Sequence, residues 1–457
     1  ENGELQAFKL EIIEDTGAYA KAGPPVLMRA IVHAPGPYEF PHVEVSGKVV
    51  YTNNPPCAAM RGFGAPQVLI TLETQLREIC NKLDISPVEL RKKNGFEEGS
   101  ETGTGQILET DPGYQKVLDE VEPIWEEWKK EIENKAGQKE NIEKGVGMAG
   151  TWFGIGKTGL PSSDTMRTEL TSDGEIILYN GVADIGQGST TAMRMITAEE
   201  LNQEPEDIEV VEMDTRYTED CDLTCASRQT LFGGSAAKRS AEKLAESIKE
   251  RIASLKGCKK DEVRLAPGRM AIVDGEEILL SEVTEGESIE EMGEFVTPER
   301  VVIDQKEVKG TPYLDYTYGA TVVEVEVDTE TGSVEVGRVK TLFNTGKAIN
   351  PLYVEGQLDG GVGWGVSQAL KEEYIPAETD SFTDYIILGA LETPEIDSSF
   401  VDVPQSSGEY GQVGIGECAH YPILPAIANA INDACGVWIR DLPFSSERVR
   451  KKISGGW

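Results

Sequence analysis

A glycine-rich stretch that ends at a single carboxylate is the feature that most constrains how this chain can fold. Between Gly408 and Ile431 the sequence reads GEYGQVGIGECAHYPILPAIANAI, with glycines at 408, 411, 414 and 416 directly before Glu417. Glycine has no Cβ, so the backbone here can approach another group closely. The helical spacing of apolar residues from Pro425 to Ala434 predicts a rigid helix after this loop. Taken alone, such a loop is most often an ordinary turn, so its meaning depends on the rest of the chain.

The composition excludes several classes of partner. With 457 residues the chain is long enough for about two to four domains. Its 43 lysines and arginines against 80 aspartates and glutamates give a net charge of −37, which repels nucleic acid and anionic membranes. No apolar run of about eighteen residues occurs, so the sequence predicts no membrane span. Because no signal-like segment precedes Glu1, we expect that a start has been removed or that the chain begins partway through a larger architecture.

The cysteines and histidines argue against several kinds of site. Seven cysteines are too sparse for a disulfide framework in a chain of this length, so we expect reduced thiols and a cytoplasmic location. Cys221 and Cys225 are four residues apart, but no second cysteine or histidine pair has the spacing of a zinc site. The three histidines are scattered along the sequence, which argues against a histidine-based metal site and against a Ser-His-Asp triad.

The order of apolar patterns predicts an α+β fold of mixed sheets with packed helices. Strand-like alternation covers residues 4–50, including Val26, Ile31 and Val32, and helical spacing follows at 66–93 and 111–139. Strand, polar loop and helix then recur to residue 254, before surface strands at 258–310, a hairpin at 322–341 and helices at 358–370 and 425–434. We therefore expect a first domain at 1–130, a charged linker at 131–144, and a second domain at 145–457 with subdomains at 145–295 and 296–457.

Five loops rich in small residues each precede a predicted helix. They are residues 60–67, 184–190, 224–230, 344–357 and the loop that carries Glu417. Backbone amides at helix starts bind phosphates and other anions, and glutamine and serine add polar contacts without charge. If the five loops converge, they would hold a large cofactor that bears phosphate. Each loop considered separately is more often a helix-entry turn.

Four of these motifs together resemble a known family. AMRGFGAPQ at 59–67, Gly-Gln-Gly at 186–188, Asn350-Pro351 with Gly356-Gln357, and GIGE at 414–417 with PAIANA at 425–430 are similar to the molybdenum-binding subunit of the xanthine dehydrogenase and aldehyde oxidase family. The likeness runs from about Glu4 to Val449 and covers the later part of that subunit. It implies the molybdopterin-binding fold of the family, and a sister polypeptide that carries the earlier part and completes the site.

The resemblance also implies roles for single residues. Glu417 matches the general base of a hydroxylation that reduces the metal by two electrons. Arg61 matches a backbone contact near the metal. Matches to contacts of the pterin cofactor are Gly186, Gln187, Gly188, Cys225, Ala226, Ser227 and Gln357. The resemblance implies no protein ligand to the molybdenum, because the dithiolene of the pterin holds the metal.

Three residues bear on the substrate. Arg29 matches the arginine with which purine-oxidising members orient substrate and stabilise its developing negative charge, and Phe63 matches an aromatic residue that packs on a planar ring. Both favour xanthine or a related purine. Lys157 stands where those members have a second stacking aromatic, and a cation there would suit a carboxylated ring such as nicotinate. An aldehyde is a further alternative, and Val413 replaces a lysine that the family often carries before its base.

The resemblance implies partners as well. The cofactor is expected to be molybdopterin, in the cytosine dinucleotide form, with molybdenum. This chain has neither clustered cysteines for an iron–sulfur cluster nor a flavin fingerprint, so a 2Fe-2S subunit and an FAD subunit are expected to carry the electrons away. The complex is expected to be a hetero-oligomer, and a dimer of heteromers is one arrangement of it. From another class of function, the chain could be a non-catalytic scaffold or a cofactor-insertion partner.

Overall fold

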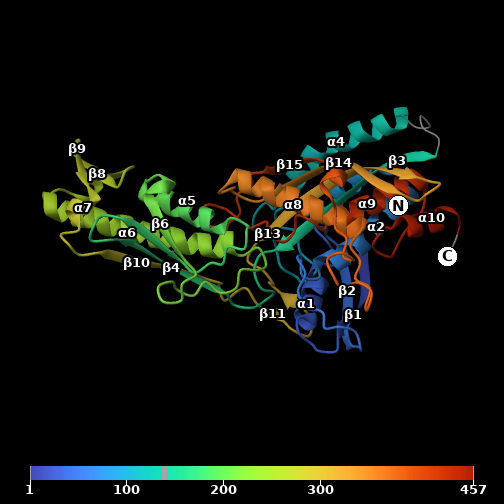
Figure 1. Cartoon of the computed structure of the whole chain (residues 1–457), viewed down its shortest axis with the longest axis horizontal. Coiled ribbons are helices and arrows are strands. Elements are labelled where there is room, and N and C mark those ends of the chain that lie inside the picture. Colours follow the sequence, from blue (N-terminus) through green and yellow to red (C-terminus); the bar gives the residue numbers. More distant parts are fainter. Residues whose placement is uncertain (1, 136–140, 456–457) are drawn as a thin grey trace.

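The computed structural model describes residues 2–135 and 141–455, which form an elongated molecule of two lobes (Figure 1). Residues 155–296 make the small lobe, drawn in green and yellow at the left of Figure 1, and the rest of the described residues make the large lobe. Helices and mixed sheets occur in both lobes, so the predicted α+β class is confirmed. No helix among the described residues is both long enough and apolar enough to cross a bilayer.

A four-stranded sheet in the order β15-β14-β13-β3 forms the centre of the large lobe. Its strands are β3 (Ile142–Gly154), β13 (Tyr316–Asp328), β14 (Val334–Asn344) and β15 (Glu395–Val401). Successive side chains of a strand point to opposite faces, which lets α4 (Tyr114–Lys135) pack on one face and α9 (Ile423–Cys435) on the other. The hairpin predicted at 322–341 and the helix predicted at 425–434 are therefore confirmed.

In the first part of the large lobe, one segment that was predicted to be a strand is a helix. Val26, Ile31 and Val32 are predicted to lie in a strand, but they lie in helix α1 (Gly23–His33), between the parallel strands β1 (Ala7–Gly17) and β2 (His42–Tyr51). Pro24 and Pro25 occupy the first turn of α1, where a missing N–H costs nothing. Helices α2 (Ala65–Leu83) and α3 (Pro87–Asn94) confirm the helical prediction for residues 66–93.

The small lobe is built on a second four-stranded sheet, in the order β10-β4-β5-β6. Two helices, α5 (Ser189–Leu201) and α6 (Gln229–Lys256), pack against each other and share the core of this sheet. The sheet strands are β4 (Ser163–Leu170), β5 (Ile176–Asn180), β6 (Ile208–Glu212) and β10 (Ile289–Val296). The far end carries β7 (Val263–Ala266), β8 (Met270–Val273), β9 (Glu276–Leu279) and the short helix α7 (Leu280–Val283).

Two further helices and one small strand pair complete the large lobe. These elements are α8 (Pro351–Leu370), α10 (Ser446–Ile453), β11 (Ile303–Asp304) and β12 (Lys309–Gly310). Helix α8 begins seven residues earlier than the predicted start at 358, because Asn350 caps it and Pro351 occupies its first position.

The predicted linker at 131–144 does not separate two hydrophobic cores. Of the predicted linker 131–144, the first part belongs to α4, the last part begins β3, and residues 136–140 lie outside the described residues. One hydrophobic core joins Val88, Val117 and Trp128 to Trp152 and Tyr318. Residues from both sides of the predicted linker thus share the interior of the large lobe.

Candidate functional site

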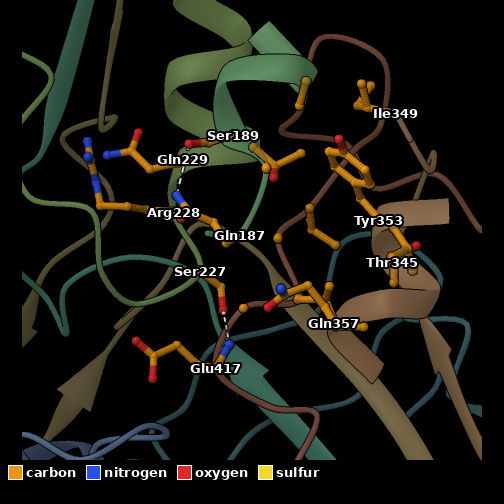
Figure 2. Close-up of a pocket in the computed structure, with 18 of the residues that line it drawn as sticks. Gln187, Ser189, Ser227, Arg228, Gln229, Thr345, Ile349, Tyr353, Gln357 and Glu417 are labelled. Atoms are coloured by element: carbon orange, nitrogen blue, oxygen red, sulfur yellow. Dashed lines mark hydrogen bonds between the residues drawn. The ribbon is translucent and has the colours of Figure 1, made fainter. Parts of the chain in front are cut away.

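A cavity of about 560 Å³ lies where the two lobes meet (Figure 2). Its wall is made by five segments that are far apart in the sequence. They are Arg61, 185–192, 224–230, 345–364 and 413–417. These segments belong to the five loops that the sequence analysis singled out, so the loops converge on one cavity as predicted.

Three helix N-termini face this cavity. Ser189 opens α5, Gln229 opens α6, and Asn350 precedes the first residue of α8, and all three residues line the wall. The dipole of each helix gives its first turn a partial positive charge. At α5 the Asp184 carboxylate already accepts from the Thr190 N–H, so the starts of α6 and α8 are the better sites for an anionic group such as a phosphate.

One carboxylate, that of Asp184, fixes the backbone of the loop before α5. The Asp184 oxygens accept hydrogen bonds from the backbone N–H groups of Gly186 at 2.8 Å, Gly188 at 3.3 Å and Thr190 at 3.1 Å. Partial burial raises the pKa of Asp184, but these donors outweigh that effect and the net shift is downward. A Cβ on Gly188 would lie 2.2 Å from the Tyr353 ring, whereas one on Gly186 would meet nothing within 4 Å. Gln187 folds back onto this loop and donates to the Ser189 hydroxyl at 2.8 Å.

The loop before α6 has an unusual backbone. Ala226 and Ser227 both adopt the left-handed region, with φ of +53° and +54°, which is uncommon for residues other than glycine. A Cβ on Gly414 would lie 1.9 Å from the Ser227 carbonyl oxygen, so this loop and the glycine-rich loop touch through their backbones. Strained residues of this kind persist where the surrounding structure fixes them, and they are concentrated at functional sites.

A buried ion pair fixes the same loop from behind. The Arg228 guanidinium donates to the Asp164 carboxylate at 2.5 Å and to the carbonyls of Cys221 at 2.9 Å and Leu223 at 3.2 Å. Neither side chain of the pair has any exposed surface. Burial raises the pKa of Asp164 to about 7, an effect that the nearby Arg228 charge reduces.

Glu417 lies on the cavity wall and is held by two other loops. Its carboxylate accepts from the Gly62 N–H at 2.6 Å and from the Ala226 N–H at 2.9 Å. Its own N–H donates to the Ser227 hydroxyl at 2.9 Å, a contact that Figure 2 shows. Three loops from different parts of the chain therefore fix the orientation of this one acid.

Arg61 joins the glycine-rich loop to α8. Its Nε donates to the Gly416 carbonyl at 2.7 Å and its Nη2 to Gln357 Oε1 at 3.3 Å. Its guanidinium lies 5.5 Å from the Trp364 ring centre, and Trp364 in turn stacks on the buried His420. Burial and the Arg61 charge lower the pKa of His420 to about 3, so this ring is neutral near pH 7.

The three residues predicted to bind substrate do not line the cavity. Arg29 is buried, and its two Nη atoms donate to the carbonyls of Gly154 at 3.0 Å and Gly156 at 2.5 Å. Lys157 forms an ion pair with Asp222 at 2.6 Å. Phe63 has a φ of +49° and lies half-buried in the loop that also provides Gly62.

The other predicted site residues lie together at the cavity. Arg61, Gly186, Gln187, Gly188, Cys225, Ser227, Gln357 and Glu417 all line the cavity, and Ala226 contacts Glu417 through its N–H. Burial, and next the Glu417 charge, raise the pKa of the Cys225 thiol, which keeps it protonated near pH 7.

The polar groups of the cavity fit a large anionic cofactor. Among the described lining residues Glu417 carries the one carboxylate, against the cations Arg61 and Lys347, while the buried Asp164 pairs with the charge of Arg228. The Gln229 Oε1 atom and the Thr345 hydroxyl are buried and accept or donate no hydrogen bond within the described part of the chain. Such atoms normally have a partner, so a polar ligand at this position would satisfy them.

Comparison with known proteins decides the family. A family model described as a molybdopterin cofactor-binding domain matches residues 120–394, and a second model with the same description matches residues 1–95. The chain belongs to the molybdopterin cofactor-binding family.

Relatives of this family match the whole chain. A probable subunit of xanthine dehydrogenase from Bacillus subtilis (strain 168) is 32% identical over 99% of this chain and 60% of its own length. A putative xanthine dehydrogenase molybdenum-binding subunit of Escherichia coli (strain K12) is 30% identical over 99% of this chain and 61% of its own length. The solved aldehyde oxidoreductase of Desulfovibrio desulfuricans ATCC 27774 superposes with a TM-score of 0.87 at 28% identity, over 98% of this chain and 47% of that one. The chain thus spans about 60% of the length of the two curated relatives.

Sequence reasoning missed several residues of the cavity. Arg228, Tyr353 and Trp364 line it, yet none was selected. Arg228 is part of a loop that was selected, but its ion-pair partner Asp164 is 64 residues away. Tyr353 lies within the predicted loop 344–357 and Trp364 lies further along α8, and their helical spacing to Gln357 is the signal that could have identified them.

Proposed function

We propose that this chain provides the cofactor cradle and the general base of a molybdenum hydroxylase that inserts oxygen from water at an electron-poor carbon. The observation that carries this proposal is the Glu417 carboxylate, which the Gly62 and Ala226 N–H groups hold at the wall of a cavity lined by helix N-termini. A lone acid fixed in this way is suited to accept a proton at one defined position.

The geometry supports a set of residues that would hold the cofactor. The N-termini of α6 and α8 would bind phosphate groups, while Gln187, Ser227 and Gln357 would contact the pterin. The other contacts would come from Arg61, Gly186, Gly188, Cys225 and Ala226. When bound, molybdopterin with molybdenum, expected in the cytosine dinucleotide form, supplies the oxygen-transfer and two-electron chemistry that protein side chains lack.

The side chains have separate tasks in this scheme. Glu417 accepts a proton at one of its two oxygens, and the two N–H donors keep both oxygens oriented for this. Arg61 links Gly416 to Gln357, so it fixes the distance between the base and the pterin-binding face of α8. The Trp364 ring lies beside Arg61 and stacks on the neutral His420, which helps to orient the guanidinium.

Other subunits would complete the enzyme. We expect a sister polypeptide that carries the rest of the molybdenum-binding subunit, a 2Fe-2S subunit and an FAD subunit, assembled in the cytoplasm as a hetero-oligomer. The support is that both curated relatives are named as subunits and are longer than this chain.

The preferred substrate is xanthine or a related purine, with nicotinate second. The support is that the two curated relatives bear the name xanthine dehydrogenase. One observation favours an aldehyde as a further candidate, because Arg29 gives both Nη atoms to backbone carbonyls and does not line the cavity. An aldehyde needs no cation to orient it.

Replacement of the acid tests the function. In the complete complex we expect Glu417→Gln to keep molybdenum and pterin but to lose about 10²–10⁴-fold in turnover with an artificial electron acceptor. Glu409→Gln is the matched control, since this glutamate is in the same stretch but outside the cavity lining. Near-normal turnover of Glu417→Gln would remove Glu417 from the reaction, and a native complex without molybdenum and pterin would favour a scaffold.

A substrate panel tests the purine assignment. Xanthine, nicotinate and an aldehyde would be assayed with the wild-type complex and with Arg29→Met. We expect xanthine to have the highest kcat/KM and Arg29→Met to impair it far more than nicotinate. Equal losses for all three substrates would show that Arg29 acts only through the Gly154 and Gly156 carbonyls, and would contradict the purine assignment.

A further inference from the structure

A second cavity, of about 280 Å³, lies in the large lobe. Residues within three segments that are far apart in the sequence form its wall, at 105–112, 300–318 and 405–406. No described residue lines both this cavity and the one that contains Glu417. Ligand pockets usually measure about 300–1,000 Å³, so this cavity has room for a small molecule of about one ring.

The Asp315 carboxylate lines this cavity and lacks a counter-ion. Asp315 is 7% exposed and forms no ion pair within the described part of the chain. Its oxygens accept from the N–H groups of Tyr316 and Ser407, each at 3.3 Å, which is longer than the usual limit of about 3.2 Å. The nearby Arg300 is paired with Glu109 at 2.8 Å. A buried charge of this kind is costly, so a bound cation would stabilise it.

Two further polar groups of the cavity wall have no partner. Tyr318 is 2% exposed, and its hydroxyl makes no hydrogen bond with any described residue. Burial, and next the Asp315 charge, raise the pKa of Tyr318, which shows that the two groups lie within electrostatic reach of each other. Gln405 donates through Nε2 to the Asp111 and Val403 carbonyls, whereas its Oε1 accepts nothing from the described residues. The cavity therefore offers a carboxylate, an amide oxygen and a hydroxyl that can all accept a hydrogen bond.

The surroundings of these groups indicate the chemistry of a ligand. Three apolar side chains complete the wall, those of Leu108, Val301 and Leu314. The parallel N–H groups of an amidinium or a guanidinium match the two oxygens of a carboxylate. The net charge of −37 attracts cations to the chain and repels anions. These features favour a small cation with planar N–H donors on an apolar body.

The same cavity lies next to the glycine-rich stretch. The Gln405 N–H donates to the Gly411 carbonyl at 3.0 Å. Thr317, two residues after the carboxylate of the cavity, donates through its hydroxyl to the Gly414 carbonyl at 2.7 Å. A ligand that contacts the cavity wall would therefore restrain the segment that leads to Glu417.

We propose that this cavity binds a small planar cation with N–H donors, such as an amidinium, a guanidinium or a protonated aminoheterocycle. The cation pairs with the Asp315 carboxylate and donates to Gln405 Oε1 and the Tyr318 hydroxyl. Its binding restrains residues 405–414, at the start of the glycine-rich stretch. The site is separate from the cofactor cavity, and the inference does not rest on the proposed function.

Calorimetric titration of the complete complex tests the class of ligand. Benzamidine is the probe, and benzamide and benzoate are its neutral and anionic analogues of nearly the same shape. We expect the Kd of benzamidine to be at least about tenfold lower than that of benzamide, with no binding of benzoate, because a charge-assisted pair forms with benzamidine alone. No binding of benzamidine at millimolar concentration, or equal Kd values for benzamidine and benzamide, would overturn the proposal.

Replacement of the wall residues tests the location of the site. We expect Asp315→Asn to raise the Kd of benzamidine by at least about tenfold and Tyr318→Phe by about threefold to tenfold. The matched controls are Asp397→Asn, at an exposed ion pair, and Tyr114→Phe, at a buried tyrosine whose ring centre lies 6.1 Å from that of Tyr318. Neither control residue lines the cavity, so both should keep the wild-type Kd.

The two wall variants also guard against misfolding. Far-UV circular dichroism would show whether each variant keeps its fold, and Tyr318→Phe, which keeps the buried ring, retains the test if Asp315→Asn unfolds. A wild-type Kd in a folded Tyr318→Phe variant together with a wild-type Kd in a folded Asp315→Asn variant would place the bound benzamidine elsewhere and overturn the site.

Hydrogen exchange tests the restraint of the glycine-rich stretch. We expect saturating benzamidine to slow exchange of amides in residues 405–414 by at least about threefold, since a ligand stabilises the state that binds it. The loop 184–190, at the cofactor cavity, is the internal control and should exchange at an unchanged rate. Equal exchange of residues 405–414 with and without benzamidine would overturn the restraint. Molybdenum and pterin content report on the proposed function alone, so a complex that lacks both but binds benzamidine would refute that function and leave this site in place.

Discussion

Among the described residues each lobe contains one arginine–carboxylate pair whose side chains have no exposed surface, and the hydrogen bonds of the two pairs are satisfied to different degrees. In the large lobe Arg91 contacts Glu73, and the Glu73 oxygens also accept from the Tyr38 hydroxyl at 2.6 Å and the Gly150 N–H at 3.1 Å. In the small lobe Arg228 contacts Asp164, whose second oxygen has no hydrogen-bond partner among the described residues. Both pairs are completely buried.

The pair in the large lobe serves stability, whereas the pair in the small lobe serves the functional site. Glu73 connects a helix, a strand and the Tyr38 ring with every oxygen used, so its environment stabilises the core of the large lobe. Arg228 instead donates from Nη1 to the carbonyls of Cys221 and Leu223, directly before the loop that carries Ala226 and Ser227. The Arg228–Asp164 pair leaves one Asp164 oxygen unsatisfied, and it holds a strained loop in place. That loop in turn orients Glu417.

Removal of the large-lobe carboxylate should have the largest effect on stability. We expect Glu73→Gln to lower the free energy of unfolding by about 3–5 kcal/mol, because a buried Arg91 charge then loses its counter-ion. Urea unfolding followed by tryptophan fluorescence measures this. The control is Glu44→Gln, at the exposed pair with Lys9, where we expect no measurable change. A loss below about 1 kcal/mol for Glu73→Gln would show that the comparison between the pairs is wrong.

Removal of the small-lobe carboxylate should cost less stability and more function. We expect Asp164→Asn to lower the free energy of unfolding by about 1–3 kcal/mol, because a pKa of about 7 leaves Asp164 partly protonated at neutral pH, so less charge is lost than in Glu73→Gln. It should also lower the pterin content of the purified complex, because the 224–228 loop is no longer fixed. Normal pterin content with lowered stability would mean that the pair does not position the loop.

The smallest expected effect is on the pH dependence of stability. The pKa of Asp164 is about 7 in the folded chain and 3.8 in its ordinary state, so the folded chain binds this proton more tightly between those values. The contribution of Asp164 is therefore greatest below about pH 4 and declines as the pH rises to about 7, by at most about 1.4 kcal/mol per pH unit. Urea unfolding at several pH values should show this decline in wild type and its absence in Asp164→Asn. Parallel pH profiles for the two proteins would contradict it.

Local chemistry explains what the sequence could predict. Glycines, helix-start residues and apolar spacing act within a few residues, which is why the five loops and α2, α5 and α9 were predicted. Helix α1 was missed because its β-branched residues Val26, Ile31 and Val32 resemble a strand locally, and packing decided otherwise.

Long-range partnerships explain what the sequence could not predict. Asp164 and Arg228 are 64 residues apart, and nothing near either residue indicates a pair. Arg29 was expected beside the substrate, but its orientation depends on the carbonyls of Gly154 and Gly156, more than 120 residues away. The left-handed conformation of Ala226 and Ser227 likewise depends on their neighbours rather than on their own identity.

The charge of the cavity wall has a consequence for how the site is filled. Among the described residues, the cations Arg61 and Lys347 and the carboxylate of Glu417 line it, whereas the chain as a whole carries a net charge of −37. A phosphate-bearing molecule must cross a repulsive potential before it reaches attractive groups. At physiological ionic strength the Debye length is about 8 Å, which confines that repulsion to the last steps of approach. Loading of this site should therefore be slow in dilute buffer and accelerate as salt is added, the reverse of ordinary electrostatic steering.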